Sequence, residues 1–304
     1  MILERTPAES RADRKRVKWL RIGLAGFLVL VGVGIAASFI ASSATARQDK
    51  APQTYVGVGA AGTNNYVEVD ARVGQIAPVG STVTVRLDVH PHGIYATKIY
   101  SLSEAMNLEV AGVVGGHVSY VANQQPEPVD ASMELVGNLS QYPFDSYRWF
   151  VAMAMTSGPK SSTIIPLRVV LSSTQHDWKV TPQLASVRTD GTVDVNLFAH
   201  RSVGTVALAL FEMFIMVAIA AIALCISYTA IAGHHELSWG LFGWLGAMLF
   251  ALPAIRNTMP GVPGTGTLAD YTVYFWALLT VALCLLVIGI TYIRRTIKIE
   301  EHGK

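Results

Sequence analysis

Charged residues and cysteines are scarce in this chain. Asp, Glu, Lys and Arg make up 14% of the 304 residues, and there are two cysteines, Cys225 and Cys284. Globular proteins average about 25% of these charged residues, so the composition excludes an ordinary soluble protein. Both cysteines lie in long apolar runs, and none occurs between residues 47 and 201. That segment is therefore not a small secreted module stabilised by disulfides.

Motifs that carry enzyme chemistry are also missing from the sequence. It contains neither a Gly-x-Ser-x-Gly nucleophile motif nor a phosphate-binding Gly-x-x-x-x-Gly-Lys-Ser/Thr loop. His90 and His92 share one face of a predicted strand, but a zinc site needs three or four ligands. Five further histidines show no metal-ligand spacing: His117, His176, His200, His234 and His235. The sequence therefore predicts no catalytic residue, no metal and no cofactor.

Long apolar runs dominate what is present. Hydrophobic residues make up 51% of the chain, and about 20 apolar residues suffice to cross a bilayer. Four runs meet this length: residues 22–46, 204–232, 237–255 and 271–293. The first is either a cleaved signal peptide, with Ala44-Thr45-Ala46 as its cleavage pattern, or an uncleaved signal anchor. We favour the anchor, because both the run and the basic segment before it are long.

Basic residues flank the apolar runs unevenly. Residues 1–21 contain seven Lys or Arg and three acids, and residues 294–304 contain Arg294, Arg295, Lys298 and Lys304. Cytoplasmic segments of membrane proteins are enriched in Lys and Arg. This pattern predicts cytoplasmic termini, with residues 47–201 and the Gly/Pro-rich loop 256–270 on the outer side. The basic N-terminal segment is then expected to meet anionic lipids rather than nucleic acid.

Residues 47–201 have the pattern of β-strands. Apolar and polar residues alternate through 66–73 and 82–89, as in strands with one buried face. Further strands are expected at 94–100, 108–114, 132–136, 147–155, 163–171, 178–182 and 192–199, while 51–65 has the composition of a linker or an irregular first strand. Many short strands separated by Pro, Gly, Asn and Asp predict a β-sandwich.

A short turn motif stands out in this segment. Pro143 restricts Tyr142 to an extended conformation, Phe144 is expected to fill the core or the junction with the membrane, and Asp145 to cap the turn or pair with an arginine. The motif is either a rigid turn at the base of the sandwich or an element that couples the domain to the helices. The first interpretation predicts that Phe144 is buried.

Tyr142-Pro143-Phe144-Asp145 and the following Tyr147-Arg148-Trp149-Phe150 resemble the signature of an actinobacterial membrane-protein family of unknown function. That family's layout, one helix, an exported domain and three helices, would cover nearly the whole chain. The motif is also similar to the Phe/Tyr-Pro-Phe-Asp turn of pentameric ligand-gated channels, whose extracellular β-sandwich precedes a basic residue and a helix, here Arg201. This chain differs from a channel subunit in having no cysteines around the turn, an extra helix before the domain, and three spans after it.

The apolar runs contain two further candidate sites. Glu212 lies at the outer interface if its span begins at Met213, which we favour, or within the membrane if the span begins near Gly204; Arg256 would then be its candidate partner. In the next span Gly240, Gly243 and Gly246 recur every three residues. Small residues let helices approach closely, so this stripe packs either within the chain's own bundle or against another protein.

The sequence therefore predicts an α+β membrane protein, with one exported all-β sandwich and four transmembrane helices. We expect a non-enzymatic accessory or scaffolding subunit of a cell-envelope assembly, which contacts lipids and a protein partner. A homo-oligomeric channel-like or ligand-sensing protein is the first alternative. An envelope enzyme is the second, because scattered residues can converge in the fold.

Overall fold

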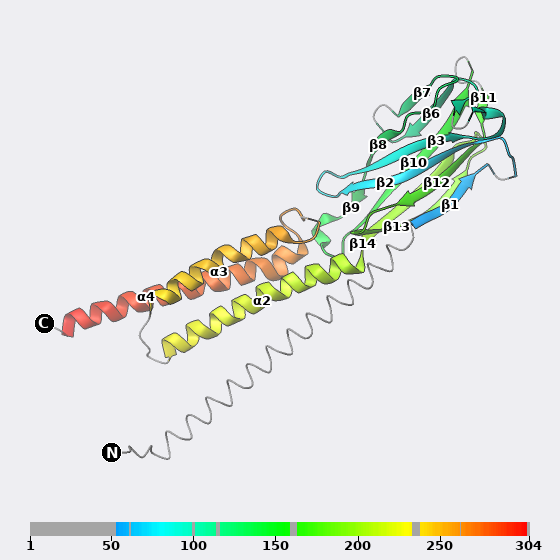
Figure 1. Cartoon of the computed structure of the whole chain (residues 1–304). Coiled ribbons are helices and arrows are strands. Elements are labelled where there is room, and N and C mark those ends of the chain that lie inside the picture. Colours follow the sequence, from blue (N-terminus) through cyan, green and yellow to red (C-terminus); the bar gives the residue numbers. More distant parts are fainter. Residues whose placement is uncertain are drawn as a thin grey trace, which may run out of the picture.

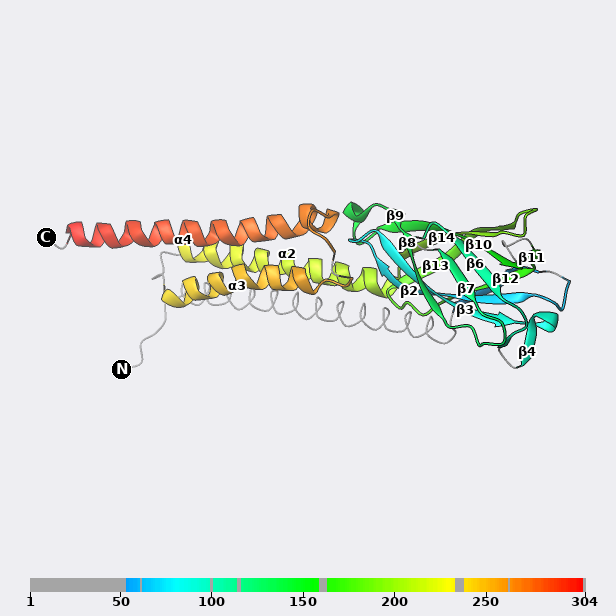
Figure 2. The same cartoon turned by 90° about the horizontal axis from the view of Figure 1, so that it is seen from above.

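The computed structural model describes residues 53–302, apart from 61, 99–100, 114–115, 159–162, 233–237 and 262. The β-strands form one end of an elongated molecule, and three long helices extend away from them side by side (Figures 1 and 2). The first predicted span, 22–46, and the basic segment 1–21 lie outside the described residues. The described part is a mixed α+β structure in which a sandwich of two sheets is followed by three helices.

One layer of the sandwich is a five-stranded sheet in the order β1-β12-β2-β3-β8. In this sheet β12 and β2 are parallel, and the other described neighbouring strands are antiparallel. In β2 and β3 the buried and exposed side chains alternate, as the sequence pattern predicted. The apolar residues of both strands face the other sheet. The bounds are Gln53–Gly59 (β1), Val67–Ala77 (β2), Thr82–Pro91 (β3), Val129–Glu134 (β8) and Leu167–Ser173 (β12).

The second layer is a seven-stranded sheet in the order β13-β14-β10-β6-β7, with β9 and β11 also paired to β10. Its long central strand β10 buries every second residue in its first half, including Tyr147 and Trp149. The bounds are Met106–Ala111 (β6), His117–Tyr120 (β7), Val136–Gly137 (β9), Ser146–Ser157 (β10), Thr163–Ile165 (β11), Trp178–Val187 (β13) and Val193–Arg201 (β14); a separate small hairpin joins Ala96–Lys98 (β4) and Ser101–Leu102 (β5).

The structure corrects several predicted strands. The single strand expected at 163–171 is two strands, because β11 pairs with β10 while β12 pairs with β1 and β2 in the other sheet. The break falls at Pro166, which has no N–H for a ladder. The strand expected to end at Pro182 continues to Val187 through a register shift next to this proline. Strand β7 was not predicted, and part of 94–100 is a 3₁₀ turn, Gly93–Tyr95.

Three described helices are long and apolar enough to cross a membrane. They are Val203–Ala232 (α2), Trp239–Thr258 (α3), and Asp270–Tyr274, a π-helical turn (η3), which continues into Phe275–His302 (α4). Their ends lie within a few residues of the predicted spans, except that α4 runs on through the basic tail. The 30 residues of α2 give a length of about 45 Å.

The molecule has two separate hydrophobic cores. One lies between the two sheets and contains residues such as Val69, Leu87 and Met153. The other lies between the helices and includes Met216, Leu245 and Val281. Tyr142 of the β domain belongs to the helical core. The turn after β9 therefore connects the two parts of the protein.

Candidate functional site: the junction between sandwich and helices

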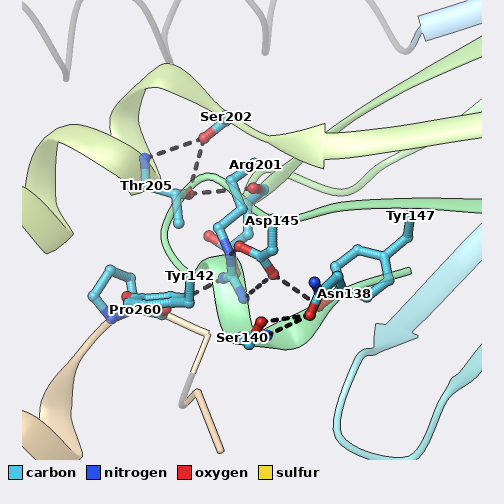
Figure 3. A network of polar contacts seen from close by, with 10 residues as sticks. Asn138, Ser140, Tyr142, Asp145, Tyr147, Arg201, Ser202, Thr205 and Pro260 are labelled. Carbon is cyan, nitrogen blue, oxygen red and sulfur yellow. Dashed lines mark hydrogen bonds and ion pairs between the residues drawn. The ribbon is translucent and has the colours of Figure 1, made fainter. Parts of the chain in front are cut away.

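The predicted turn lies where the sandwich meets the helices (Figure 3). A 3₁₀ turn, Leu139–Gln141 (η2), precedes it, and the Asn138 side chain caps this turn by accepting hydrogen bonds from the backbone N–H and the hydroxyl of Ser140. A cis Tyr142–Pro143 peptide follows, and the chain then enters β10 at Ser146. We call the turn 138–145, the β14–α2 boundary and the loop 259–269 together the junction.

The motif buries different residues from those we expected. Phe144 was predicted to fill the core or the junction with the membrane, but 58% of its surface is exposed. Tyr142 is completely buried and Asp145 is 1% exposed. The interpretation of Phe144 as a core residue was therefore wrong, because alternation alone does not tell which face of a turn meets a second domain. Tyr142 is the aromatic residue that packs against the helices.

Asp145 forms a buried ion pair with Arg201, the last residue of β14. Nε and Nη2 of Arg201 donate to the two carboxylate oxygens at 2.5 and 3.0 Å, and both side chains are at most 1% exposed. The hydroxyl of Tyr147 donates a third hydrogen bond to Asp145, at 2.9 Å. Burial, together with the charge of Asp145, raises the pKa of the Tyr147 phenol. The carboxylate is therefore fully paired although it has left water.

Two aromatic rings enclose the guanidinium of Arg201. Its central carbon lies 4.5 Å from the ring centre of Tyr142 and 4.6 Å from that of Trp178. Both distances fall within the range of cation–π attraction, which strengthens when the cation is desolvated. Arginine suits this position because its planar group stacks on rings while it binds a carboxylate through two N–H groups.

The same residues reach the loop between α3 and α4. The Tyr142 hydroxyl and Nη1 of Arg201 both donate to the carbonyl oxygen of Pro260, at 3.0 and 3.4 Å. Burial raises the pKa of the Tyr142 phenol, so this group remains a donor. Gly261 has a φ of +75°, and a side chain there would collide with the Arg201 guanidinium. The β domain is thus hydrogen-bonded to the α3–α4 loop, in addition to its covalent connection to α2.

The chain connection between the two parts is one residue long. Strand β14 ends at Arg201 and α2 begins at Val203, so Ser202 alone links them. The backbone N–H of Ser202 donates to the Asp177 carbonyl at 2.8 Å, and its hydroxyl accepts from the N–H of Thr205 at 3.2 Å. The second bond is a helix N-cap. The capped helix therefore begins directly at the end of a paired strand.

A second buried ion pair holds the 259–269 loop. Arg256, near the end of α3, donates to both carboxylate oxygens of Asp270, at 2.9 and 3.0 Å, and to the carbonyls of Pro263 and Gly264. The Asp270 carboxylate also accepts from the backbone N–H groups of Gly266 and Thr267. Arg256 was our candidate partner for Glu212, and the structure pairs it with Asp270 instead.

Glu212 lies in the third turn of a helix that begins at Val203. Its side chain is half-buried, and one carboxylate oxygen, Oε2, is buried without a hydrogen-bond partner among the described residues. It stands beside the buried stripe of α2 formed by Ala209 and Met216. The structure therefore gives Glu212 no partner in the described part of the chain.

The glycine stripe of α3 is not a contact within the described bundle. A methyl group added at Gly243 or Gly246 would meet no atom within 4 Å, and at Gly240 it would approach only the neighbouring Ser238. Close packing against α2 or α4 would place backbone or side-chain atoms there. The described helices therefore do not support the interpretation that the stripe packs within the chain's own bundle.

The histidines do not converge in the described residues. No group of three or more His, Cys, Asp or Glu side chains there could hold a metal ion. His92 stacks on Tyr66 with ring centres 4.5 Å apart, and His200 contacts the carbonyl of Lys179. His234, His235 and Glu236 lie outside the described residues.

The junction coincides with a boundary between two sequence families. Residues 57–197 match a family described as "Domain of unknown function (DUF4436)", and residues 201–295 match "Domain of unknown function (DUF8686)". Both parts of the chain resemble uncharacterised domain families. No curated protein matches the chain. The predicted likeness to an uncharacterised family is confirmed at this level, while an actinobacterial origin and the channel resemblance stay predictions.

Sequence reasoning identified half of each ion pair. It selected Asp145 from the motif and Arg256 from its place at the end of an apolar run, and it noted Arg201 and Asp270 only as boundary residues. The available signal was that three charged residues, Arg201, Arg256 and Asp270, flank spans on the same predicted side of the membrane. Charges of both signs at the end of apolar runs indicate ion pairs there, because a charge that leaves water needs a partner of opposite sign.

The exposure of Phe144 gives the first testable prediction. Phe144→Ala should lower the free energy of unfolding by less than about 1 kcal/mol, whereas truncation of a buried Phe costs about 3–5 kcal/mol. Thermal unfolding of the detergent-solubilised full chain measures the difference. Leu87→Ala, at a fully buried core position, is the positive control. A Phe144→Ala loss as large as that of the control would show that the ring is buried in solution.

Proposed function

We propose that this protein is a multi-pass plasma-membrane protein that acts as a non-enzymatic accessory or scaffolding subunit of a cell-envelope assembly. In this proposal residues 22–46 form an uncleaved signal anchor, both termini are cytoplasmic, and the β domain lies on the outer side. The three described helices are long enough to span a bilayer. The sandwich, the start of α2 and the α3–α4 loop lie at one end of the molecule, and α4, whose last third contains Arg294 and Arg295, ends at the other (Figure 1). This arrangement supports the proposed orientation.

The observation that carries this proposal is the presence of two buried ion pairs at the junction. Asp145–Arg201 lies in the β domain where it meets the helices, and Arg256–Asp270 joins the end of α3 to the start of η3; both arginines donate to backbone carbonyls of the loop 259–269. A domain held in this way keeps a defined position above its helices, which a scaffold requires when it binds partners through both parts. The apolar surface that the helices leave exposed is available to lipids and to a partner's helices.

One observation favours the second candidate, a homo-oligomeric channel-like or ligand-sensing protein. The turn that resembles the channel motif contacts the strand-to-helix boundary through Asp145 and Arg201. A movement of the sandwich would therefore reach α2 directly. This contact is the feature that a coupling element needs.

Native mass spectrometry distinguishes the two candidates. The full chain is extracted with its neighbouring lipids into polymer nanodiscs, without prior delipidation. A scaffolding subunit should appear in complexes whose mass includes other polypeptides. A single species whose mass is a whole multiple of this chain would contradict the scaffolding proposal and favour the homo-oligomer.

The proposed orientation predicts the reactivity of introduced cysteines. In a background with Cys225 and Cys284 replaced by serine, Thr189→Cys, on the exposed hairpin turn between β13 and β14, should react with a membrane-impermeant maleimide on intact cells. Gly303→Cys, next to the basic tail, should react only after lysis. Labelling of Gly303→Cys on intact cells would overturn the orientation.

A further inference from the structure

The seven-stranded sheet has a gap beside its central strand. On one edge of β10, β9 pairs only with Tyr147 and Arg148, and β6 begins to pair only at Ala152. Residues 149–151 have no described strand partner on that edge. The gap exists because β9 is just two residues long, and the chain reaches it directly from β8 in the other sheet.

A cleft of about 610 Å³ opens at this gap. This volume lies within the range of small-molecule sites, roughly 300–1,000 Å³. Two neighbouring strands contribute polar side chains to the lining, Arg148 from β10 and Asn196 from β14, and Gln183 adds a second amide from the irregular part of β13. Glu134, at the end of β8, lines it as well.

Two neighbouring aromatic residues of β10, Trp149 and Phe150, also line the cleft. Trp149 is 3% exposed, and its indole N–H is buried without an acceptor in the described part of the chain. A buried donor of this kind costs free energy until something accepts its hydrogen bond. Phe150, its neighbour, is 40% exposed and adds an aromatic surface to the same cleft.

We propose that this cleft binds a neutral oligosaccharide. The single positive charge of Arg148 is offset by Glu134, so the lining does not select an anion. The Asn196 and Gln183 amides each donate and accept hydrogen bonds, as sugar hydroxyls do. The exposed ring of Phe150 offers an apolar surface for the C–H face of a sugar ring.

A peptide strand is a poorer match for the same cleft. Strand addition requires an exposed sheet edge along which main-chain hydrogen bonds can form. The open edge of β10 is limited to residues 149–151, and β9 and β6 bound it on both sides. A compact ligand with hydroxyls on its rim fits such a gap better than an extended chain.

This inference goes beyond the proposed scaffolding function. If the domain is exported, as proposed above, the cleft would meet such ligands, because cell-envelope glycans lie outside the membrane. The binding test below uses purified protein and does not depend on orientation. Its failure would leave the junction and the topology proposal unaffected.

The test uses the full chain in lipid nanodiscs prepared without glycoside detergents, whose headgroups would compete. Maltotriose and triacetylchitotriose are titrated by calorimetry and by saturation-transfer NMR. At least one should bind with a dissociation constant of about 1 mM or tighter. Phe150→Ala and Asn196→Ala should each weaken binding at least roughly tenfold. Ile164→Ala, which removes another exposed apolar side chain of the same sheet, should not.

Three outcomes would overturn the proposal. One is the absence of binding by both trisaccharides up to roughly 10 mM. Another is binding that Phe150→Ala and Asn196→Ala leave unchanged, since the sugar would then lie elsewhere. The third is binding of an extended acetyl-Val-Thr-Val-Thr-amide peptide where neither sugar binds, which would assign the cleft to a polypeptide ligand.

Discussion

Replacing Arg201 with methionine should destabilise the protein strongly. The substitution leaves the Asp145 carboxylate, which is 1% exposed, with only the Tyr147 hydroxyl as a donor. Removing one partner of a buried ion pair costs about 3–5 kcal/mol. For a protein of this size that corresponds to a fall in thermal midpoint of roughly 6–20 °C. Thermal unfolding of the full chain in nanodiscs measures it.

Two further variants show whether the charge of Arg201 or the geometry of its contacts is responsible for the stability that it provides. Arg201→Lys keeps the charge but loses the two-pronged contact and the stacking between Tyr142 and Trp178, so it should remain clearly destabilised. The double variant Arg201→Met/Asp145→Leu removes both charges and should recover part of the loss. If the double variant is as unstable as the sum of its single variants, the two side chains do not act as a pair.

The matched control is an ion pair in the same domain whose arginine is exposed. Arg188 contacts Asp194, but 56% of its side chain is exposed. Arg188→Met should therefore cost no more than about 1 kcal/mol, because exposed pairs contribute little. Equal losses for Arg188→Met and Arg201→Met would contradict the importance that we give to burial at the junction.

Asp270→Ala should produce the second large loss, again about 3–5 kcal/mol. It leaves the Arg256 guanidinium with only the carbonyls of Pro263 and Gly264, and it removes the acceptor for the N–H groups of Gly266 and Thr267. The loop 259–269 should open as a consequence. Hydrogen exchange of its amides, followed by mass spectrometry, should show faster exchange there than in the strands of the sandwich.

Asp130→Ala, an exposed carboxylate on β8, is the control and should change stability by less than about 0.5 kcal/mol. A second comparison tests our earlier pairing of Arg256 with Glu212. The effects of Glu212→Gln and Arg256→Ala should add within about 0.5 kcal/mol, because Arg256 is bound to Asp270. A coupling well above that value would show that the two residues do interact.

The two ion pairs together explain how the loop 259–269 is held at the junction. Each pair is buried, and each donates to backbone carbonyls of the loop 259–269, through Pro260 in one case and Pro263 in the other. Hydrogen bonds to charged groups are stronger than those between neutral groups. The loop is therefore held from both sides, by the β domain and by α3, which keeps the sandwich in one position above the helices.

The features that the sequence alone determined are local. Alternation with a period of two placed the strands that became β2 and β3, because successive side chains of a strand point to opposite faces. The apolar runs located α2, α3 and α4 within a few residues, because a span is recognised by its length and lack of charge. Many short strand patterns separated by turn residues in 47–201 were enough to predict a sandwich. Pro166, visible in the sequence, divides what we took for one strand.

The tertiary structure alone decided which distant residues meet. Arg201 and Asp145 are 56 residues apart, and no spacing rule links the end of a strand to a turn in the middle of the domain. The choice of Tyr142 over Phe144 as the buried ring depended on where the loop after α3 lies. The gap beside β10 arose from the pairing of β6 and β9 with different parts of one strand. Such contacts depend on the order of strands and on the packing of two domains, and local periodicity carries no information about either.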